Sequence, residues 1–133
     1  MQKVRKKHRQ KDSLEIARLI AAAALEKKAE NLVILDVQGV SSFADYFVIM
    51  SGRSTRHVQG LADAVAAELQ TRRVSSSTSE GLNEGLWVLL DYGDVIIHIF
   101  YKETRAFYDL EGLWHDAVRV DPSPVRTAPR NKK

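Results

Sequence analysis

Four short apolar runs constrain the fold of this chain more than any other feature. They cover residues 32–37, 46–51, 86–90 and 95–101 and are rich in β-branched and aromatic residues, a composition typical of buried strands. The first two runs are joined by a connection too short for a crossover helix, so we expect them to pair antiparallel. The last two are joined by a short segment in which Gly93 can supply the positive φ of a tight hairpin turn.

Helical periodicity fills the segments around these runs. Apolar residues recur every three or four positions over about 13–28, after Ser54 and over 103–118, which predicts three amphipathic helices. Asp12 or Ser13 is expected to cap the first helix, and Ser54 or Thr55 the second. The apolar side of the third is expected to hold Phe107, Leu110, Leu113, Trp114 and Ala117.

The order of these elements is helix, strand, strand, helix, strand, strand, helix, with a loop or a poor edge strand at 74–85. It predicts an α/β fold in which a small mixed sheet is packed with helices. The second strand, the helix after it and the third long strand should form a right-handed crossover unit.

Charge divides the chain into three parts. Residues 1–11 carry a net charge of +6, residues 12–118 of −7 and residues 119–133 of +4, although the whole chain is only +3. We expect one domain at 12–118 between two disordered basic tails, the second of which contains three prolines. Basic tails attract polyanions, whereas an acidic body suits a basic protein partner.

Several classes of protein are disfavoured by the composition. The chain has no cysteine, so it has neither disulfides nor thiolate chemistry. Its longest unbroken apolar run, 19–25, is far shorter than the ~20 residues of a membrane span, and no secretory h-region follows the basic start. We therefore expect a cytoplasmic protein without a membrane segment. No zinc-binding spacing links the four histidines, which are His8, His57, His98 and His115.

One segment raises the possibility of an enzyme. Residues 51–55 place a Gly-Arg-Ser sequence between a strand and a helix, where backbone N–H groups can hold a phosphate. Nucleotidyltransferases combine such a junction with two metal-binding carboxylates one residue apart on a strand. Here Asp91 and Asp94 flank a turn instead. We therefore predict no catalytic residue, no cofactor and no metal site, and keep a divergent nucleotidyltransferase that uses Ser54 as an alternative.

The last hairpin carries the candidate binding site. With Tyr92-Gly93 as the turn, Trp87 would pair with His98, and side chains would alternate between the two faces of the sheet. One face is aliphatic and suits a core covered by helices. The other mixes aromatic, aliphatic and imidazole groups, a composition found at protein interfaces. The predicted partner-binding residues are Trp87, Leu89, Tyr92, Ile96, His98 and Phe100.

Four motifs in order resemble the ribosomal silencing factor (Iojap) family. They are the sequences at 35–37, at 42–58, at 87–98 with its W-x-x-x-D-x-G-D pattern, and at 105–114. The resemblance implies a fold related to nucleotidyltransferases without their carboxylate pair, and no catalysis. It implies a translational repressor that binds large-subunit ribosomal protein fourteen and sterically blocks the association of the ribosomal subunits. It also implies that Trp87 and Tyr92 contact this partner.

Two further interpretations stay open at this point. The basic tails could contact ribosomal RNA, either beside the protein partner or as the main activity of a tail-driven RNA-binding protein. An exposed aromatic sheet face could also pair with itself, giving a homodimer in the free protein.

Overall fold

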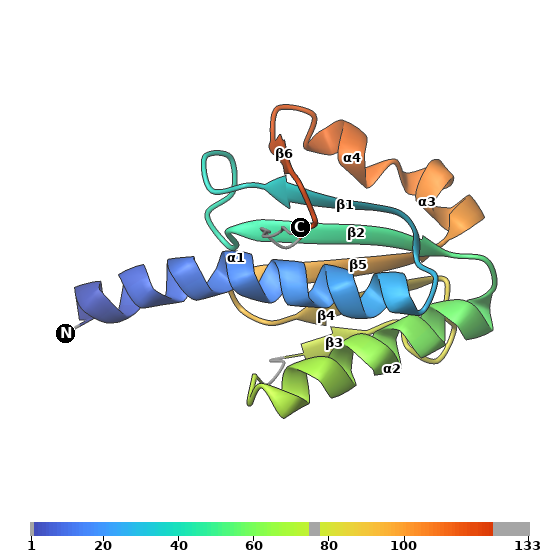
Figure 1. Cartoon of the computed structure of the whole chain (residues 1–133). Helices are drawn as coiled ribbons and strands as arrows, with labels where there is room; N and C mark the ends of the chain where they lie inside the picture. Colours follow the sequence, from blue (N-terminus) through green and yellow to red (C-terminus); the bar gives the residue numbers. More distant parts are fainter. Residues whose placement is uncertain (1, 75–77, 124–133) are drawn as a thin grey trace, which may run out of the picture.

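The computed structural model describes residues 2–74 and 78–123, with the backbone alone for residues 2–12 (Figure 1). The helices are α1 (Gln2–Glu26), α2 (Thr55–Thr71), α3 (Lys102–Tyr108) and α4 (Leu110–Leu113). The strands are β1 (Glu30–Asp36), β2 (Tyr46–Gly52), β3 (Thr78–Glu80), β4 (Trp87–Asp91), β5 (Val95–Tyr101) and β6 (Val118–Val120). The α/β fold expected from the sequence is confirmed.

The six described strands form one mixed sheet in the order β3-β4-β5-β2-β1-β6. The predicted antiparallel pairing of the first two long runs is confirmed, with Asp36 opposite Tyr46. The parallel neighbour of β2 is β5, the fourth long run, so the predicted crossover unit of the second strand, its helix and the third run is wrong. The chain passes from α2 through β3 and β4 before it enters β5. The run at 86–90 instead lies one place further out as β4, between β5 and the short edge strand β3.

Helices α1 and α2 cover one face of the sheet. Their apolar stripes pack against the even-numbered positions of β4 and the odd-numbered positions of β5, including Val88, Leu90, Ile97 and Ile99, which are fully or almost fully buried. The aliphatic face predicted for the last hairpin is therefore the main core. The helix expected after Ser54 is also confirmed as α2, and its apolar residues Val58, Leu61, Val65 and Leu69 are all buried.

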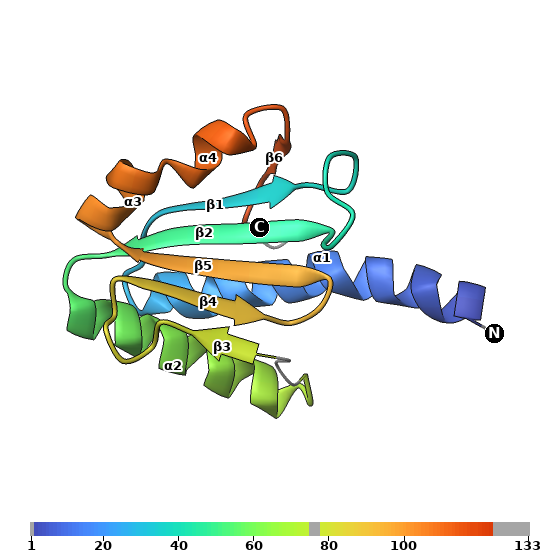
Figure 2. The ribbon, with the colours of Figure 1, turned by 180° about the vertical axis from the view of Figure 1, so that it is seen from behind.

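The opposite face is only partly covered. The short helices α3 and α4 pack over part of it, and Leu110 and Trp114 contact a second core cluster that contains Phe47 and Phe100. Figure 2 shows this face, with α3 and α4 near β1 and no helix in front of β3 and β4. On this part of the face Trp87, Leu89 and Ile96 are only half-buried, so it remains partly accessible.

Both ends of the domain differ from the sequence prediction. Helix α1 begins at Gln2 rather than near residue 13, so residues 2–11 continue a helix where a disordered tail was expected. Ser13 does not cap it but lies inside it, where its buried hydroxyl donates to Asp45 Oδ2 at 3.1 Å. At the other end, Val118–Val120 pair with β1, so the sheet extends past residue 118. Residues 124–133 of the second predicted tail lie outside the described residues.

The predicted third helix is broken into two. Asp109 adopts a left-handed conformation with φ of 47°, which ends α3 and starts α4. Asparagine, aspartate and glycine adopt this conformation more readily than other residues. The break rotates the apolar residues of 103–118 out of one common stripe, and Phe107 and Leu113 become exposed.

Candidate protein-binding surface

The last hairpin keeps its predicted faces but not its predicted register. Tyr92 pairs with Val95, leaving Gly93 and Asp94 as the two-residue turn, and Trp87 lies opposite Phe100 rather than His98. The side chain of Asp91 accepts a hydrogen bond from the Gly93 N–H at 2.8 Å, which fixes the turn at this position. Because partners shift by two residues, every side chain of the two strands stays on its expected face.

Trp87 is half-buried and is held by three neighbouring rings. Its indole lies 4.9 Å from the ring of Phe100 and 4.9 Å from that of Tyr108, measured between centroids. Its Nε1 donates a hydrogen bond of 3.1 Å to Nδ1 of His98. The indole is therefore fixed in place while part of it faces solvent, so that little side-chain entropy would be lost if a partner covered it.

His98 and Phe100 lie inside the domain, where His98 accepts the indole hydrogen bond and Phe100 packs against the indole ring. Phe100 is fully buried and His98 is 5% exposed, so neither presents a surface that a partner can contact directly. Burial lowers the pKa of His98 from 6.5 to about 4. The ring is therefore neutral at pH 7, and its Nδ1 is free to accept the indole hydrogen.

Tyr92 lies on the other side of the sheet. It packs against the core beneath α1, and it lines a small pocket with Ser13, Ile16 and Val74. Burial there raises its pKa. Trp87 and Tyr92 stand at opposite ends of β4 and face opposite ways, so one flat partner surface cannot cover both.

Two aromatic residues of α3 extend the accessible face. Phe107 is 80% exposed and its ring lies 5.0 Å from that of Tyr108, which in turn contacts Trp87. Leu89 and Ile96 are half-buried on the same face of β4 and β5. We call this set the aromatic strip: Trp87, Leu89, Ile96, Phe107 and Tyr108. Sequence reasoning placed Phe107 on the apolar side of one continuous helix, and the signal it missed was Asp109, whose left-handed conformation ends α3.

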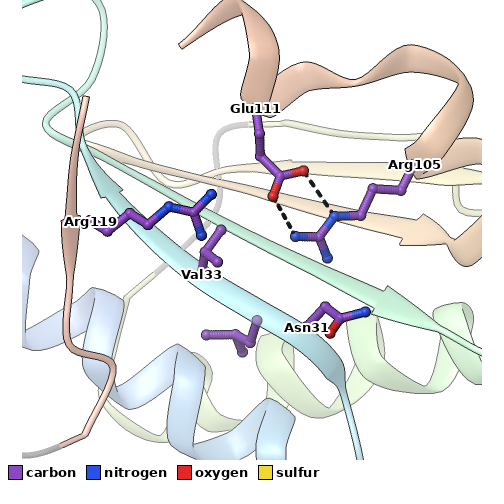
Figure 3. A pocket seen from close by; sticks show the side chains of 6 residues that line it. Asn31, Val33, Arg105, Glu111 and Arg119 are labelled. Carbon is purple, nitrogen blue, oxygen red and sulfur yellow. Dashed lines mark hydrogen bonds and ion pairs between the residues drawn. The ribbon is translucent and has the colours of Figure 1, made fainter. Parts of the chain in front are cut away.

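A largely buried arginine fixes α3 and α4 to the sheet. Arg105 donates through Nε and Nη2 to the two carboxylate oxygens of Glu111, at 3.0 and 2.8 Å, and through Nη1 to Ser51 Oγ at 2.9 Å. These hydrogen bonds from Arg105, with a smaller contribution from Arg119, lower the pKa of Glu111. Figure 3 shows the three charged side chains around an open pocket of about 530 Å³ on the β1 side of α4. Arg105 therefore links α3, which also carries Tyr108, to α4 and to β2.

The residues considered for catalysis have structural roles. Ser54 caps α2 by accepting a hydrogen bond from the His57 N–H at 3.0 Å, as predicted. His57 in turn accepts from the Arg53 N–H and contacts the Lys27 carbonyl. Among the residues that the structure describes, no group of three or more histidine, aspartate or glutamate side chains could hold a metal ion.

The pairing of Ser54 with Asp91 or Asp94 is ruled out by distance. The carbonyl of Asp94 accepts from the N–H of Tyr46, the first residue of β2, whereas Ser54 follows the last residue of that strand. A seven-residue strand is roughly 20 Å long. The alternative active site therefore does not assemble in this fold.

The fold and the strip define a small α/β domain whose most distinctive feature is an accessible aromatic sheet face rather than an enclosed pocket. In the described part of the chain, no helix is long and apolar enough to cross a membrane. A family model described as "Ribosomal silencing factor during starvation" matches residues 10–133. The chain belongs to this family.

Individual relatives agree with that assignment. The ribosomal silencing factor RsfS of Bacillus subtilis is 42% identical over 112 residues, which cover 84% of this chain and 92% of the relative. A mouse relative, named mitochondrial assembly of ribosomal large subunit protein 1, is 30% identical over 72% of this chain and 43% of its own length. A crystal structure of a Chromobacterium violaceum protein matches with a TM-score of 0.75 at 34% identity, over 77% of this chain and 85% of that one.

Proposed function

We propose that this protein represses translation by binding the large ribosomal subunit through ribosomal protein fourteen. Membership of the ribosomal silencing factor family supports a ribosome-associated role in regulating translation. The name of the mouse relative, which refers to the ribosomal large subunit, supports that subunit as the partner. As a ribosome-binding protein without catalysis it would act in the cytoplasm.

The observation that carries the proposal is the aromatic strip on an acidic body. Truncation of aromatic anchors at the centre of an interface often costs ~2 kcal/mol or more of binding free energy. Trp87, Tyr108 and Phe107 form such a centre, because their rings contact one another in series. Residues 12–118 carry a net charge of −7, which would speed the encounter with a basic ribosomal protein.

The mechanism we propose is steric. A compact domain of about 110 residues measures roughly 25–30 Å across. Docked through the strip on the surface of the large subunit that faces the small subunit, it would hold the two subunits apart. In this arrangement Trp87, Leu89, Ile96, Phe107 and Tyr108 contact the partner, while His98 and Phe100 hold Trp87 in position.

Co-sedimentation with separated ribosomal subunits tests this proposal. The wild-type protein should follow the large subunit in a sucrose gradient, and Trp87→Ala should weaken that binding by at least ~30-fold, which corresponds to ~2 kcal/mol. Leu25→Ala is the matched control, because Leu25 is 48% exposed but lies on α1, at the opposite face of the sheet. A folded Trp87→Ala variant that still sediments with large subunits like the wild type would show that the surface is wrongly assigned.

A further inference from the structure

Basic side chains gather at one place on an otherwise acidic domain. Residues 13–123 have ten basic and sixteen acidic side chains, a net charge of −6. Four of the ten basic residues are exposed in two short segments, the turn after α1 and the junction from β2 into α2. These four are Lys27, Lys28, Arg53 and Arg56. The aromatic strip includes none of them, so docking through the strip does not explain this local positive charge.

Hydrogen bonds hold the two segments against each other. Nδ1 of His57 accepts from the backbone N–H of Arg53 at 3.0 Å, so Nε2 carries the ring proton and donates to the carbonyl of Lys27 at 2.8 Å. Arg53 Nε also donates to a carboxylate oxygen of Glu30 at 2.9 Å. The backbone at Lys27 and Arg53 is therefore already in place, so little ordering of the backbone would be required when a ligand binds.

The two segments line an open pocket of about 460 Å³. We call it the cationic pocket, and its lining residues are Glu26, Lys27, Lys28, Arg53, Ser54 and His57. Within the described part of the chain, no group makes a hydrogen bond or an ion pair with the ammonium groups of Lys27 and Lys28, and the side chain of Arg53 uses only its Nε. The carboxylates of Glu26 and Glu30 offset part of the positive charge, and the two lysines remain available to an anion.

The cationic pocket lies at the same end of the sheet as Trp87. One row of paired residues runs across four strands, from Trp87 through Phe100 and Ser51 to Glu30, the ion-pair partner of Arg53. Neighbouring strands are about 4.8 Å apart, so the row is roughly 15 Å long. Figure 2 shows the end of α1, the start of α2 and the start of β4 together at this end. A standard interface covers about 800 Å² on each partner, a patch roughly 30 Å across. One large partner can therefore contact both Trp87 and the pocket.

We propose that the cationic pocket binds backbone phosphates of RNA without sequence preference, beside the protein that covers the aromatic strip. All six lining residues are polar or charged, so the pocket lacks the apolar anchors of a protein interface or a membrane surface. Its only ring is the imidazole of His57, so it offers no platform of aromatic side chains for stacking bases. Exposed cations without such groups suit phosphates. The proposal rests on docking at the large subunit only for identifying the RNA as ribosomal.

Fluorescence anisotropy with a labelled single-stranded RNA of unselected sequence tests the proposal on the full chain. The variant carries Lys28→Gln together with Arg53→Gln, which removes two cations of the pocket. For single strands each phosphate contact contributes roughly 0.7 to the slope of log affinity against log salt. The variant should therefore bind RNA more weakly than the wild type, with a slope reduced by roughly 1.4. An unchanged affinity and slope would overturn the proposal.

The matched control carries Arg72→Gln together with Arg73→Gln at the other end of α2. Arg72, like Arg53, forms one surface ion pair with a glutamate. Arg73, like Lys28, is an exposed cation with a left-handed backbone just after a helix, with φ of 62° against 68°. Both variants lose two positive charges, so only their positions differ. Equal weakening by the two variants would show that net charge alone matters and would also overturn the proposal.

Amide chemical shifts of the ¹⁵N-labelled full chain show where the RNA binds. Addition of the RNA should shift the amide signals of residues 27–29 and 53–57 more than those of residues 72–74. A nucleoside triphosphate at the same concentration of phosphate groups should shift them less. Larger shifts with the triphosphate would identify a free nucleotide as the ligand and contradict the proposal. Neither assay contains ribosomal protein, so a failure here is distinct from a failure of docking through the strip, which co-sedimentation measures.

Discussion

The indole Nε1 of Trp87 donates to Nδ1 of His98 across two neighbouring strands. This hydrogen bond requires a neutral imidazole, because a protonated ring has no acceptor. The same burial that keeps His98 neutral therefore also keeps Trp87 oriented. The orientation of Trp87 is thus linked to the protonation state of His98.

This link predicts a loss of stability in acid. The pKa of His98 is about 4 in the folded protein and 6.5 in its ordinary state, so between these values the unfolded chain binds more protons. Stability contributed by His98 is fully present above pH 6.5 and is lost as the pH falls to 4. The loss should reach about 3 kcal/mol at pH 4. Urea unfolding across this range measures it.

A His98→Phe variant serves as the control for that experiment. Phenylalanine keeps an aromatic ring at the site but cannot titrate. The free energy of unfolding of the variant should depend less on pH between 6.5 and 4 than that of the wild type. Parallel curves for the two proteins would mean that His98 does not contribute to the acid sensitivity.

The Arg105–Glu111 pair should stabilise the domain far more than a surface ion pair. Its two side chains are only 11% and 23% exposed, and removal of one partner leaves a largely buried charge. Arg105→Ala is therefore expected to cost about 2–4 kcal/mol of unfolding free energy. The comparison is Arg72→Ala, since Arg72 pairs with Glu68 at the surface and should cost less than about 1 kcal/mol. Similar losses for both, in urea denaturation, would argue against this role of Arg105.

Two glycines should respond to alanine in opposite ways. A Cβ on Gly52 would lie 2.9 Å from the side chain and 3.0 Å from the backbone nitrogen of Val58, where β2 meets α2. Gly52→Ala should therefore destabilise the domain by about 1–3 kcal/mol. A Cβ on Gly60 would meet no atom within 4 Å, and this glycine lies within α2. Gly60→Ala should stabilise by about 0.5–1 kcal/mol.

Thermal unfolding of the two variants measures this difference. The Gly52 result also bears on the junction at 51–55, which resembles a phosphate-binding turn in sequence. In the structure this glycine permits close packing against Val58. If Gly52→Ala is as stable as the wild type, close packing against Val58 does not explain why glycine occupies position 52.

The sequence was sufficient for features set by local periodicity. Alternation along β4 and β5 predicted correctly which side chains face the helices, because side-chain direction in a strand depends only on whether the position is odd or even. The register of the hairpin depended on one hydrogen bond, from the Gly93 N–H to Asp91. No periodic pattern contains that information, and a shift of two residues leaves the pattern unchanged.

Features set by distant contacts were missed for a different reason. Strand β6 has only three residues and is held by pairing with β1, more than eighty positions away. The break at Asp109 ends α3, where Tyr108 contacts Trp87 and Phe107 is exposed. The sequence placed Arg105 and Glu111 in one motif, but it did not predict the two hydrogen bonds between them. Each of these features depends on how helices and strands are placed relative to one another, and periodicity does not give that placement.

The exposed position of Phe107 leads to a prediction that separates stability from binding. Phe107 and Leu110 belong to the same apparent apolar stripe in the sequence, but Phe107 is 80% exposed whereas Leu110 packs against the second core cluster. Phe107→Ser should change the free energy of unfolding by no more than about 0.5 kcal/mol. Leu110→Ala should cost about 1–2 kcal/mol, because it removes buried methyl groups.

Binding to large subunits should be affected by Phe107 even though folding is not. Under the proposed docking through the aromatic strip, Phe107→Ser removes a contact beside Tyr108 and should weaken co-sedimentation by about 5- to 10-fold, the effect of losing roughly 1 kcal/mol at an interface. Urea unfolding and sedimentation of the same preparation measure the two quantities. A variant that loses stability but keeps its binding would place Phe107 in the core and the docking surface elsewhere.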